Sequence, residues 1–243
     1  MGVDSVFAYD GGCALFDGRS HRRRSNPSCV CGCRLGEEDS NKMIKNIVFD
    51  LGNVLIWFDE ENMVGKYVSD KEDAKLLRSV ILDRLYWDKL DAGTISDEEA
   101  VEAFKTRLPE RLWAVSKEIY YNWIYNIPPV EGMAELVQDL KKANRVRLFL
   151  LSNISTYFAE HDEVLPILAF FEKKIYSAVC GMVKPNREIF EYLRKECGIL
   201  AEETLFIDDS AKNIAGAQSV GITGYLFDGD VKRLRAYLQE FLG

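Results

Sequence analysis

Runs of apolar, β-branched residues alternate with amphipathic stretches along most of the chain. The stretches 46–51 (NIVFDL) and 145–152 (RVRLFLLS) are long apolar runs, and 204–209 (TLFIDD) and 224–227 (GYLF) are shorter ones. Continuous apolar runs of this length are typical of strands that are buried on both faces of a parallel sheet. Their alternation with helical patterns predicts an α/β fold, a Rossmann-like doubly wound parallel sheet.

Two helical patterns lie among the later strands. The stretch 186–198 places four apolar residues on one face, namely Ile189, Phe190, Leu193 and Cys197. The stretch 211–221 carries small residues at helical spacing, and we expect it to end at Gly221 as a C-cap. Both patterns agree with helices that pack against a sheet.

Residues 59–128 interrupt this alternation with helical patterns only. Ser96 and Glu99 have the spacing of a capping box that opens a helix. A later stripe is apolar and comprises Ile119, Tyr120, Trp123 and Ile124. Because these helices follow the first strand, we expect a helical cap over the carboxyl edge of the sheet, where open α/β sheets bind ligands. The predicted domains are a catalytic core, 43–58 and 129–243, and an inserted cap, 59–128.

Residues 1–42 differ in composition from the rest of the chain. They are rich in Gly, Ser, Arg and Cys, and their six acidic and six basic residues cancel, so the net charge of −8 belongs to residues 43–243. The CVCGC sequence at 29–33 lacks the second ligand pair of a zinc site. A disordered leader or an upstream extension is the simpler interpretation.

Charge and composition exclude several classes of protein. No basic stripe is present outside Arg22–Arg24, so no nucleic-acid partner is expected. No apolar run approaches the roughly 20 residues of a membrane helix, so no membrane partner is expected. Only Cys180 and Cys197 occur beyond residue 42, which favours a cytoplasmic protein. A single histidine in residues 43–243, His161, excludes a Ser-His-Asp hydrolase and a histidine-rich zinc enzyme.

Polar residues stand where the predicted strands end or the next helix begins. They are Asp50, Ser152, Asn153, Lys184, Asp208 and Asp209. Each of them alone also fits an ordinary role, such as capping a turn or lying on the surface. Because the carboxyl ends of parallel strands converge on one crevice, the combination predicts a site for a divalent cation and a phosphate. The lysine would offset phosphate charge that carboxylates alone repel.

The order of these segments resembles a known family. FDLGNVLI, LFLLSN, VKPNREIF and TLFIDDSAKNIAGA are similar to the four motifs of the haloacid dehalogenase-like hydrolase superfamily, across residues 43 to about 240. The DLGNV sequence, together with LDAGTISDEEAVEAF, is most similar to bacterial alpha-D-glucose-1-phosphate phosphatases. The resemblance implies a Rossmann-like sheet with a mobile helical cap.

The resemblance also implies roles for the acidic residues and the lysine. Asp50 is the expected nucleophile, which forms an aspartyl-phosphate, and Lys184 bridges this residue and the phosphate. Mg²⁺ is the expected cofactor, bound by Asp50, by the carbonyl of Gly52 and by Asp209. Asp208, on the same motif, is assigned to the catalytic group, in or next to the coordination sphere of the metal.

The expected substrate is a small phosphorylated metabolite, such as a sugar 1-phosphate. Asn53, Ser152 and Asn153 are assigned to substrate binding together with Lys184. By the resemblance, Ser152 and Asn153 hold the phosphoryl oxygens. The oligomeric state is not readable from the sequence.

Gly52 departs from the pattern of the wider family, in which an aspartate at this position protonates the leaving group. General acid–base help is worth about 10²–10⁴ in rate, so its absence matters. Three explanations stay open: a substrate that leaves easily, another acid such as Asp59 or one from the cap, or a phosphometabolite-binding or regulatory protein with little turnover. Hydrolysis of a carbon–halogen bond is a further alternative, but it does not require the acidic pair.

Overall fold

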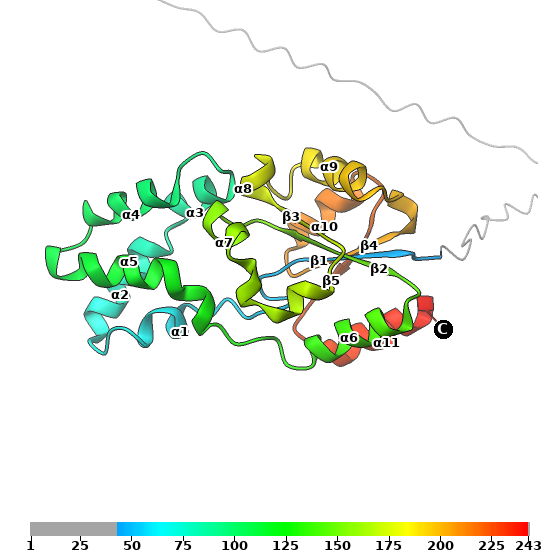
Figure 1. Ribbon diagram of the computed structural model, residues 1–243, viewed down its shortest axis with the longest axis horizontal. Coiled ribbons are helices and arrows are strands. Elements are labelled where there is room, and N and C mark those ends of the chain that lie inside the picture. Colours follow the sequence, from blue (N-terminus) through cyan, green and yellow to red (C-terminus); the bar gives the residue numbers. More distant parts are fainter. Residues whose placement is uncertain (1–42, 243) are drawn as a thin grey trace, which may run out of the picture. The chain divides into compact units, whose positions relative to one another are not determined.

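Five parallel strands form one sheet in the computed structural model, which describes residues 43–242. The strands are β1 (Asn46–Phe49), β2 (Arg147–Ser152), β3 (Lys173–Tyr176), β4 (Thr204–Asp208) and β5 (Thr223–Leu226). Their spatial order is β3-β2-β1-β4-β5, and each neighbouring pair is parallel (Figure 1). The first strand, β1, therefore lies at the centre of the sheet. The next two, β2 and β3, lie on one side of it, and β4 and β5 lie on the other. The predicted doubly wound α/β sheet is confirmed.

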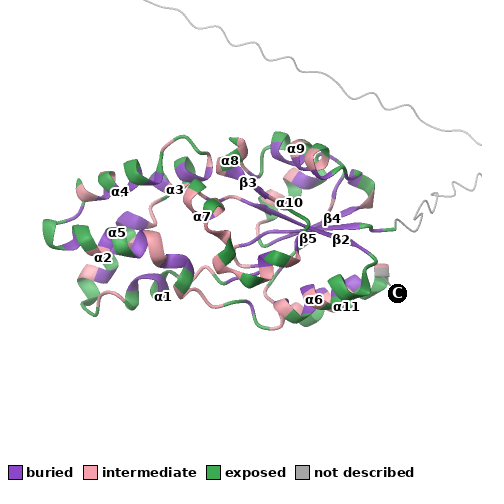
Figure 2. Cartoon of the chain, in the orientation of Figure 1, coloured by how far each residue is buried: buried purple, intermediate pink, exposed green. Residues whose placement is uncertain are grey.

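Helices cover both faces of this sheet. The four longest of them beside the sheet are α6 (Met133–Ala143), α9 (Arg187–Cys197), α10 (Ala211–Gln218) and α11 (Val231–Leu242). Figure 1 shows α6 and α11 on one face and α9 and α10 on the other. Successive residues of β1 alternate between the two layers: Ile47 and Phe49 belong to one apolar cluster and Val48 to the other. The central strands β1, β2 and β4 are almost wholly buried as a result, whereas the edge strands β3 and β5 are partly exposed (Figure 2).

The segment between β1 and α6 is helical, as its sequence pattern predicts. Its helices are α1 (Glu60–Gly65), α2 (Lys71–Ile81), α3 (Arg84–Asp91), α4 (Asp97–Lys105) and α5 (Trp113–Asn122), with the 3₁₀ turns η1 (Glu110–Leu112) and η2 (Trp123–Asn126). The capping box is confirmed, because the Ser96 hydroxyl accepts from the Glu99 N–H and the Glu99 carboxylate accepts from the Ser96 N–H. All four residues of the predicted apolar stripe are buried, although the helix changes to a 3₁₀ turn at Trp123.

Short elements complete the fold at the ends of β2, β3 and the later helices. They are α7 (Thr156–Glu160), η3 (Asp162–Val164), η4 (Pro166–Phe170), α8 (Ser177–Cys180) and η5 (Ala201–Glu203). Two sequence expectations differ from the structure. The short strand β3 was not expected, because its sequence KKIY has no long apolar run. The C-cap expected at Gly221 is wrong: α10 ends at Gln218, and Gly221 lies in the following turn with φ of +86°.

Aromatic and polar contacts join the helices of residues 60–122 to the sheet region. The Phe58 ring contacts Trp87 of α3 and Trp123 of η2, and Trp123 stacks on Phe158 of α7. Asp97 of α4 is buried and accepts a hydrogen bond from the Tyr157 N–H of α7 at 3.2 Å. One apolar cluster runs without a break from β1 into α1–α5. The division into a core and a cap at residues 59–128 stays a prediction.

Two sequence expectations concern membranes and the N-terminal leader. Within residues 43–242, no helix has both the length and the apolarity needed to cross a membrane. The leader, 1–42, with its CVCGC sequence, lies outside the described residues.

Gly93, in the turn after α3, allows the closest backbone approach between this helix and α8. It has φ of +65°, and a Cβ atom placed there would lie 2.5 Å from the carbonyl oxygen of Ala178. Gly181 has a similar φ of +68°, but a Cβ atom there would meet nothing within 4 Å among the described residues. The pair therefore separates left-handed strain from close packing.

We expect Gly93→Ala to destabilise the protein more than Gly181→Ala does. Both variants carry the left-handed penalty of about 1–2 kcal/mol, and Gly93→Ala adds an overpacking term of about 1–3 kcal/mol. Urea denaturation of both variants measures the difference. Equal losses of unfolding free energy would contradict the close contact between the Gly93 turn and α8.

Candidate active site

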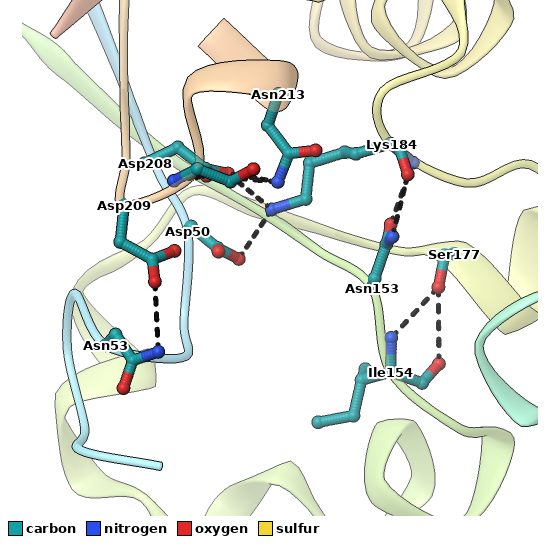
Figure 3. Close-up of polar contacts among 10 residues, drawn as sticks. Asp50, Asn53, Asn153, Ile154, Ser177, Lys184, Asp208, Asp209 and Asn213 are labelled. Carbon is teal, nitrogen blue, oxygen red and sulfur yellow. Dashed lines mark hydrogen bonds and ion pairs between the residues drawn. The ribbon is translucent and has the colours of Figure 1, made fainter. Parts of the chain in front are cut away.

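The residues predicted at the strand ends meet at the carboxyl edge of the sheet beside β1. Asp50 directly follows β1, Ser152 ends β2 and Asp208 ends β4. The Asp50 N–H donates to the carbonyl of Ile207 at 2.9 Å, which holds the first strand end level with β4. Lys184 enters from the loop between α8 and α9 and points at Asp50 and Asp208 (Figure 3).

Lys184 lies between two carboxylates. Its Nζ is 2.7 Å from Asp50 Oδ1 and 2.8 Å from Asp208 Oδ2. Only 1% of the lysine side chain is exposed, against 11% for Asp50 and 0% for Asp208. The ammonium also lies 5.4 Å from the centre of the Phe206 ring. A buried cation shared by two carboxylates leaves one negative charge in excess, which a further cation can balance.

Asp208 accepts three hydrogen bonds from Ser210 and Asn213 and a fourth from Lys184. Its Oδ1 accepts from the Ser210 N–H at 2.8 Å and from Asn213 Nδ2 at 3.0 Å, and its Oδ2 accepts from Asn213 Nδ2 at 3.1 Å and from Lys184. These bonds fix the carboxylate in place, and through it they fix the lysine. The geometry of Asp208 is that of a positioning residue, and its assignment to the catalytic group stays a prediction.

Asn153 holds the backbone of Lys184. Its Nδ2 donates to the Lys184 carbonyl at 3.0 Å, and its Oδ1 accepts from the Lys184 N–H at 2.9 Å. Both ends of the amide are therefore engaged, and the side chain sets the position of the lysine (Figure 3). Its predicted contact with phosphoryl oxygens stays a prediction, as does that of Ser152, whose side chain lines the cavity.

The loop after β1 brings Asn53 to Asp209. Asn53 has φ of +54°, its N–H donates to the Ile56 carbonyl at 2.7 Å, and its Nδ2 donates to Asp209 Oδ2 at 3.0 Å. Its Oδ1 accepts from the Phe58 N–H at 3.0 Å. The Asn53 side chain thus joins the two loops. It also lines the cavity, and its predicted contact with substrate stays a prediction.

Gly52 is not required by the local packing. A Cβ atom at this position would meet nothing within 4 Å among the described residues, and its φ is not in the left-handed range. A larger side chain therefore fits at this position. The backbone and its packing at position 52 therefore do not explain why this residue is glycine and not aspartate.

The acidic residues can hold a divalent cation. One oxygen each of Asp50, Asp208 and Asp209 lie within 4.8 Å of one another. Carboxylate and carbonyl oxygens are the ligands that Mg²⁺ prefers. Because Asp208 is engaged with four hydrogen bonds, the oxygens best placed for an ion are those of Asp50 and Asp209.

Burial and neighbouring charges change the ionisation of this group. Burial raises the pKa of Asp50 above its ordinary value although Lys184 pulls it down, and Asp208 adds to the increase. For Lys184, burial alone lowers the pKa, but Asp50 and Asp208 outweigh it and raise the pKa above its ordinary value. The lysine is therefore charged at neutral pH. A cation beside Asp50 would favour its ionised form.

A cavity of about 470 Å³ opens in front of these residues. Its floor is the acidic group and the lysine, and its wall includes residues of the preceding helical segment, namely Phe58, Arg84, Trp87 and Asp91. A space of this size is in the range of small-molecule sites. Polar groups at the floor and aromatic rings on the wall suit a small polar ligand.

Three residues of the site were not found from the sequence. Asn213 orients Asp208, and Ser177 accepts from the Ile154 N–H at 2.9 Å, which joins α8 to the end of β2. Asp91, the last residue of α3, is buried and lines the cavity. The position of Asn213 on the first turn of α10 was a readable signal. Nothing in the sequence distinguishes Asp91 from the other acids of its segment.

A doubly wound sheet with an acidic cluster and a buried lysine at its carboxyl edge defines an α/β enzyme with a carboxylate-based site. The sequence profile of the haloacid dehalogenase-like hydrolases matches residues 44–221. The chain belongs to this family of hydrolases.

Named relatives with similar sequences include two phosphatases. A sesquiterpene phosphatase of Aspergillus oryzae is 27% identical over 184 residues, which cover 74% of this chain and 88% of the relative. A D-ribitol-5-phosphate phosphatase of Bacteroides thetaiotaomicron is 26% identical over 188 residues, with 74% and 89% covered.

A solved structure of a haloacid dehalogenase family enzyme of Bacteroides thetaiotaomicron, in complex with magnesium and inorganic phosphate, is also similar. It is 27% identical with a TM-score of 0.58, and the match covers 79% of this chain and 98% of that protein.

We expect Lys184→Met to destabilise the protein by about 3–5 kcal/mol at pH 8, because it leaves two buried carboxylates without a cation. The loss is smaller at pH 5. Without the lysine, the pKa values of both carboxylates rise in the folded state, so the penalty is present at high pH and decreases as protons bind. Urea denaturation at both pH values measures it.

The matched control is Lys173→Met, since Lys173 forms an exposed ion pair with Glu196. This substitution is expected to change stability little at either pH. A loss for Lys184→Met of equal size at pH 5 and pH 8 would contradict the electrostatic origin of the effect.

Proposed function

We propose that this protein is a Mg²⁺-dependent phosphatase that hydrolyses a small phosphorylated metabolite, such as a sugar phosphate, through an aspartyl-phosphate on Asp50. The observation that carries the proposal is the buried lysine, whose Nζ lies 2.7 Å from Asp50 Oδ1 at the floor of the cavity. The phosphatase relatives and the related structure with magnesium and phosphate support it.

Each residue has a role that follows from its position. Asp50 attacks phosphorus, since a carboxylate can accept a phosphoryl group covalently. Lys184 offsets the charge that gathers on the phosphoryl oxygens, and the Ser152 hydroxyl donates to one of them. Asn153 and Asp208 hold the lysine in place on either side. Water then hydrolyses the aspartyl-phosphate and returns the Asp50 carboxylate.

The metal complements these groups. When bound by Asp50, Asp209 and the carbonyl of Gly52, Mg²⁺ offsets the negative charge of the transferring phosphoryl group. The excess negative charge of the lysine and its two carboxylates favours such an ion.

The substrate proposal is a sugar phosphate, with a sugar 1-phosphate as the specific candidate. Arg84 offers a positive charge on the cavity wall, and Phe58 and Trp87 offer aromatic faces against which a sugar ring can pack. The ribitol-5-phosphate phosphatase acts on a polyol phosphate, which supports a small polyhydroxylated substrate. A carbon–halogen hydrolase would leave the Asp209 carboxylate without a role, which disfavours that alternative.

We expect Asp50→Asn to reduce kcat by at least about 10³-fold on any substrate found in a screen of sugar and nucleotide phosphates, because it removes the nucleophile. We also expect EDTA to abolish wild-type activity and added Mg²⁺ to restore it. The measurement is release of inorganic phosphate. Asp139→Asn is the control, because Asp139 pairs with Arg235 on α11, outside the cavity.

The outcomes separate the alternatives. Activity that survives Asp50→Asn would assign another nucleophile. Resistance to EDTA, together with turnover of haloacids, would favour carbon–halogen hydrolysis. Tight binding of a phosphorylated ligand without release of phosphate would identify a binding or regulatory protein.

A further inference from the structure

Asp91, the last residue of α3, is buried, and one of its carboxylate oxygens is unpaired within the described residues. Only 7% of the residue is exposed, and its Oδ1 is buried with no hydrogen-bond partner in residues 43–242. Buried polar atoms in folded proteins nearly always have a partner, and an unpaired carboxylate is among the most unfavourable groups to bury. An exception of this kind, in a cavity that holds a reactive group, indicates a functional carboxyl group.

Asp91 is among the residues that line the same cavity as Asp50, Lys184 and Ser152. Asp91 ends α3, and the turn that follows packs against α8, where only a glycine at position 93 avoids the carbonyl of Ala178. The helix is thereby held against an element that joins the end of β2 through Ser177. The contact of the Gly93 turn with Ala178 therefore helps to fix the position of Asp91 relative to the end of β2.

The site lacks an acid where one would be expected. Gly52 offers no side chain, although the space beyond it is open. Asp59, considered above as a substitute, accepts from Asn62 N–H and Nδ2 at the start of α1 and is not among the residues lining the cavity. Asp91 is the acid on the cavity wall that has an uncommitted oxygen.

The charges around Asp91 are mixed. On its own helix, Asp88 lies one turn and Arg84 two turns before Asp91, and these two residues pair with each other; Lys184 also influences Asp91. Burial raises the pKa of Asp91 to about 7; Arg84 and Lys184 lower it and Asp88 raises it. A carboxyl group with a pKa near the working pH can both donate and accept a proton.

We propose that Asp91 is the general acid–base of the reaction, taking the place of the carboxylate that Gly52 does not provide. This inference rests on the proposed phosphatase function. It assigns the proton transfer to the inserted helical segment and the phosphoryl transfer to the sheet.

The two half-reactions balance around this residue. In the first, Asp50 forms a bond to phosphorus, the bond from phosphorus to the leaving oxygen breaks, and the Asp91 carboxyl proton goes to that oxygen, which releases an alcohol. In the second, the Asp91 carboxylate takes a proton from water, the water oxygen attacks phosphorus, and the bond to Asp50 breaks. Phosphate leaves, and Asp91 is protonated again.

The test compares two leaving groups in the full-length enzyme with Mg²⁺. Asp91→Asn is isosteric and removes the proton donor, so we expect its kcat to fall by about 10²–10⁴-fold on the alkyl phosphate that the wild type hydrolyses best. On p-nitrophenyl phosphate, whose leaving group needs no proton, the loss is expected to stay below about tenfold. Asp139→Asn, whose carboxylate pairs with Arg235 outside the cavity, is expected to change neither rate.

Two further measurements distinguish chemistry from structure. We expect the wild-type kcat on the alkyl phosphate to fall as the pH rises above about 7, because Asp91 must be protonated at the start of the reaction. This fall is expected to be absent in Asp91→Asn. Gly52→Asp, added to Asp91→Asn, restores alkyl phosphate turnover, because the new side chain has room and supplies an acid.

Equal losses on both substrates, or an unchanged rate in Asp91→Asn, would overturn the role of Asp91 while leaving the phosphatase function intact. A wild-type enzyme that hydrolyses only the aryl phosphate would also overturn it. Failure of the wild type on every phosphate ester, or full activity of Asp50→Asn, would instead overturn the proposed function and this inference with it.

Discussion

The buried Lys184 ammonium, shared by Asp50 and Asp208, is the interaction on which the site depends. Each carboxylate alone would be unfavourable in this position, and the two together would repel each other. The lysine makes the pair tolerable, yet one negative charge stays uncompensated. That excess favours a second cation and, with it, an anionic ligand such as a phosphate. The chemistry of the site therefore follows from its charge balance.

The fold supplies the geometry that this balance requires. Parallel strands bring Asp50 and Asp208 to the same edge, because β1 and β4 are neighbours in register. The lysine comes from a loop, which has no register of its own, so Asn153 and Asp208 hold its backbone and its side chain separately. These hydrogen bonds fix the distances between the charged groups of the site.

Much of this could be predicted from the sequence, for identifiable reasons. Buried parallel strands read as apolar runs, so β1, β2 and β4 and the polar residues at their ends were predictable, and the topology of a doubly wound sheet then brings those residues together. β3 was not predictable, because an edge strand with two lysines has no such run. The roles of Asn153 and Asn213 as positioning residues depend on side-chain direction, which composition does not encode. Asp91 was not predictable, because what distinguishes it is a buried oxygen without a hydrogen-bond partner among the described residues, and a sequence does not show hydrogen bonds.

Position 52 has no acidic side chain, and Asp91 has a buried oxygen without a hydrogen-bond partner among the described residues. Both observations are explained if the proton donor of the reaction lies on α3 and not on the loop after β1. A donor on the loop after β1 belongs to the same loop as Asp50, whereas a donor on α3 belongs to the helical segment between β1 and α6. Proton transfer then requires α3 to be seated, and its seat is the contact of the Gly93 turn with Ala178. In the same proposal, phosphoryl transfer to Asp50 does not require α3. On this proposal, the release of a poor leaving group depends on the packing of the turn after α3 against α8, a contact that involves no charged side chain.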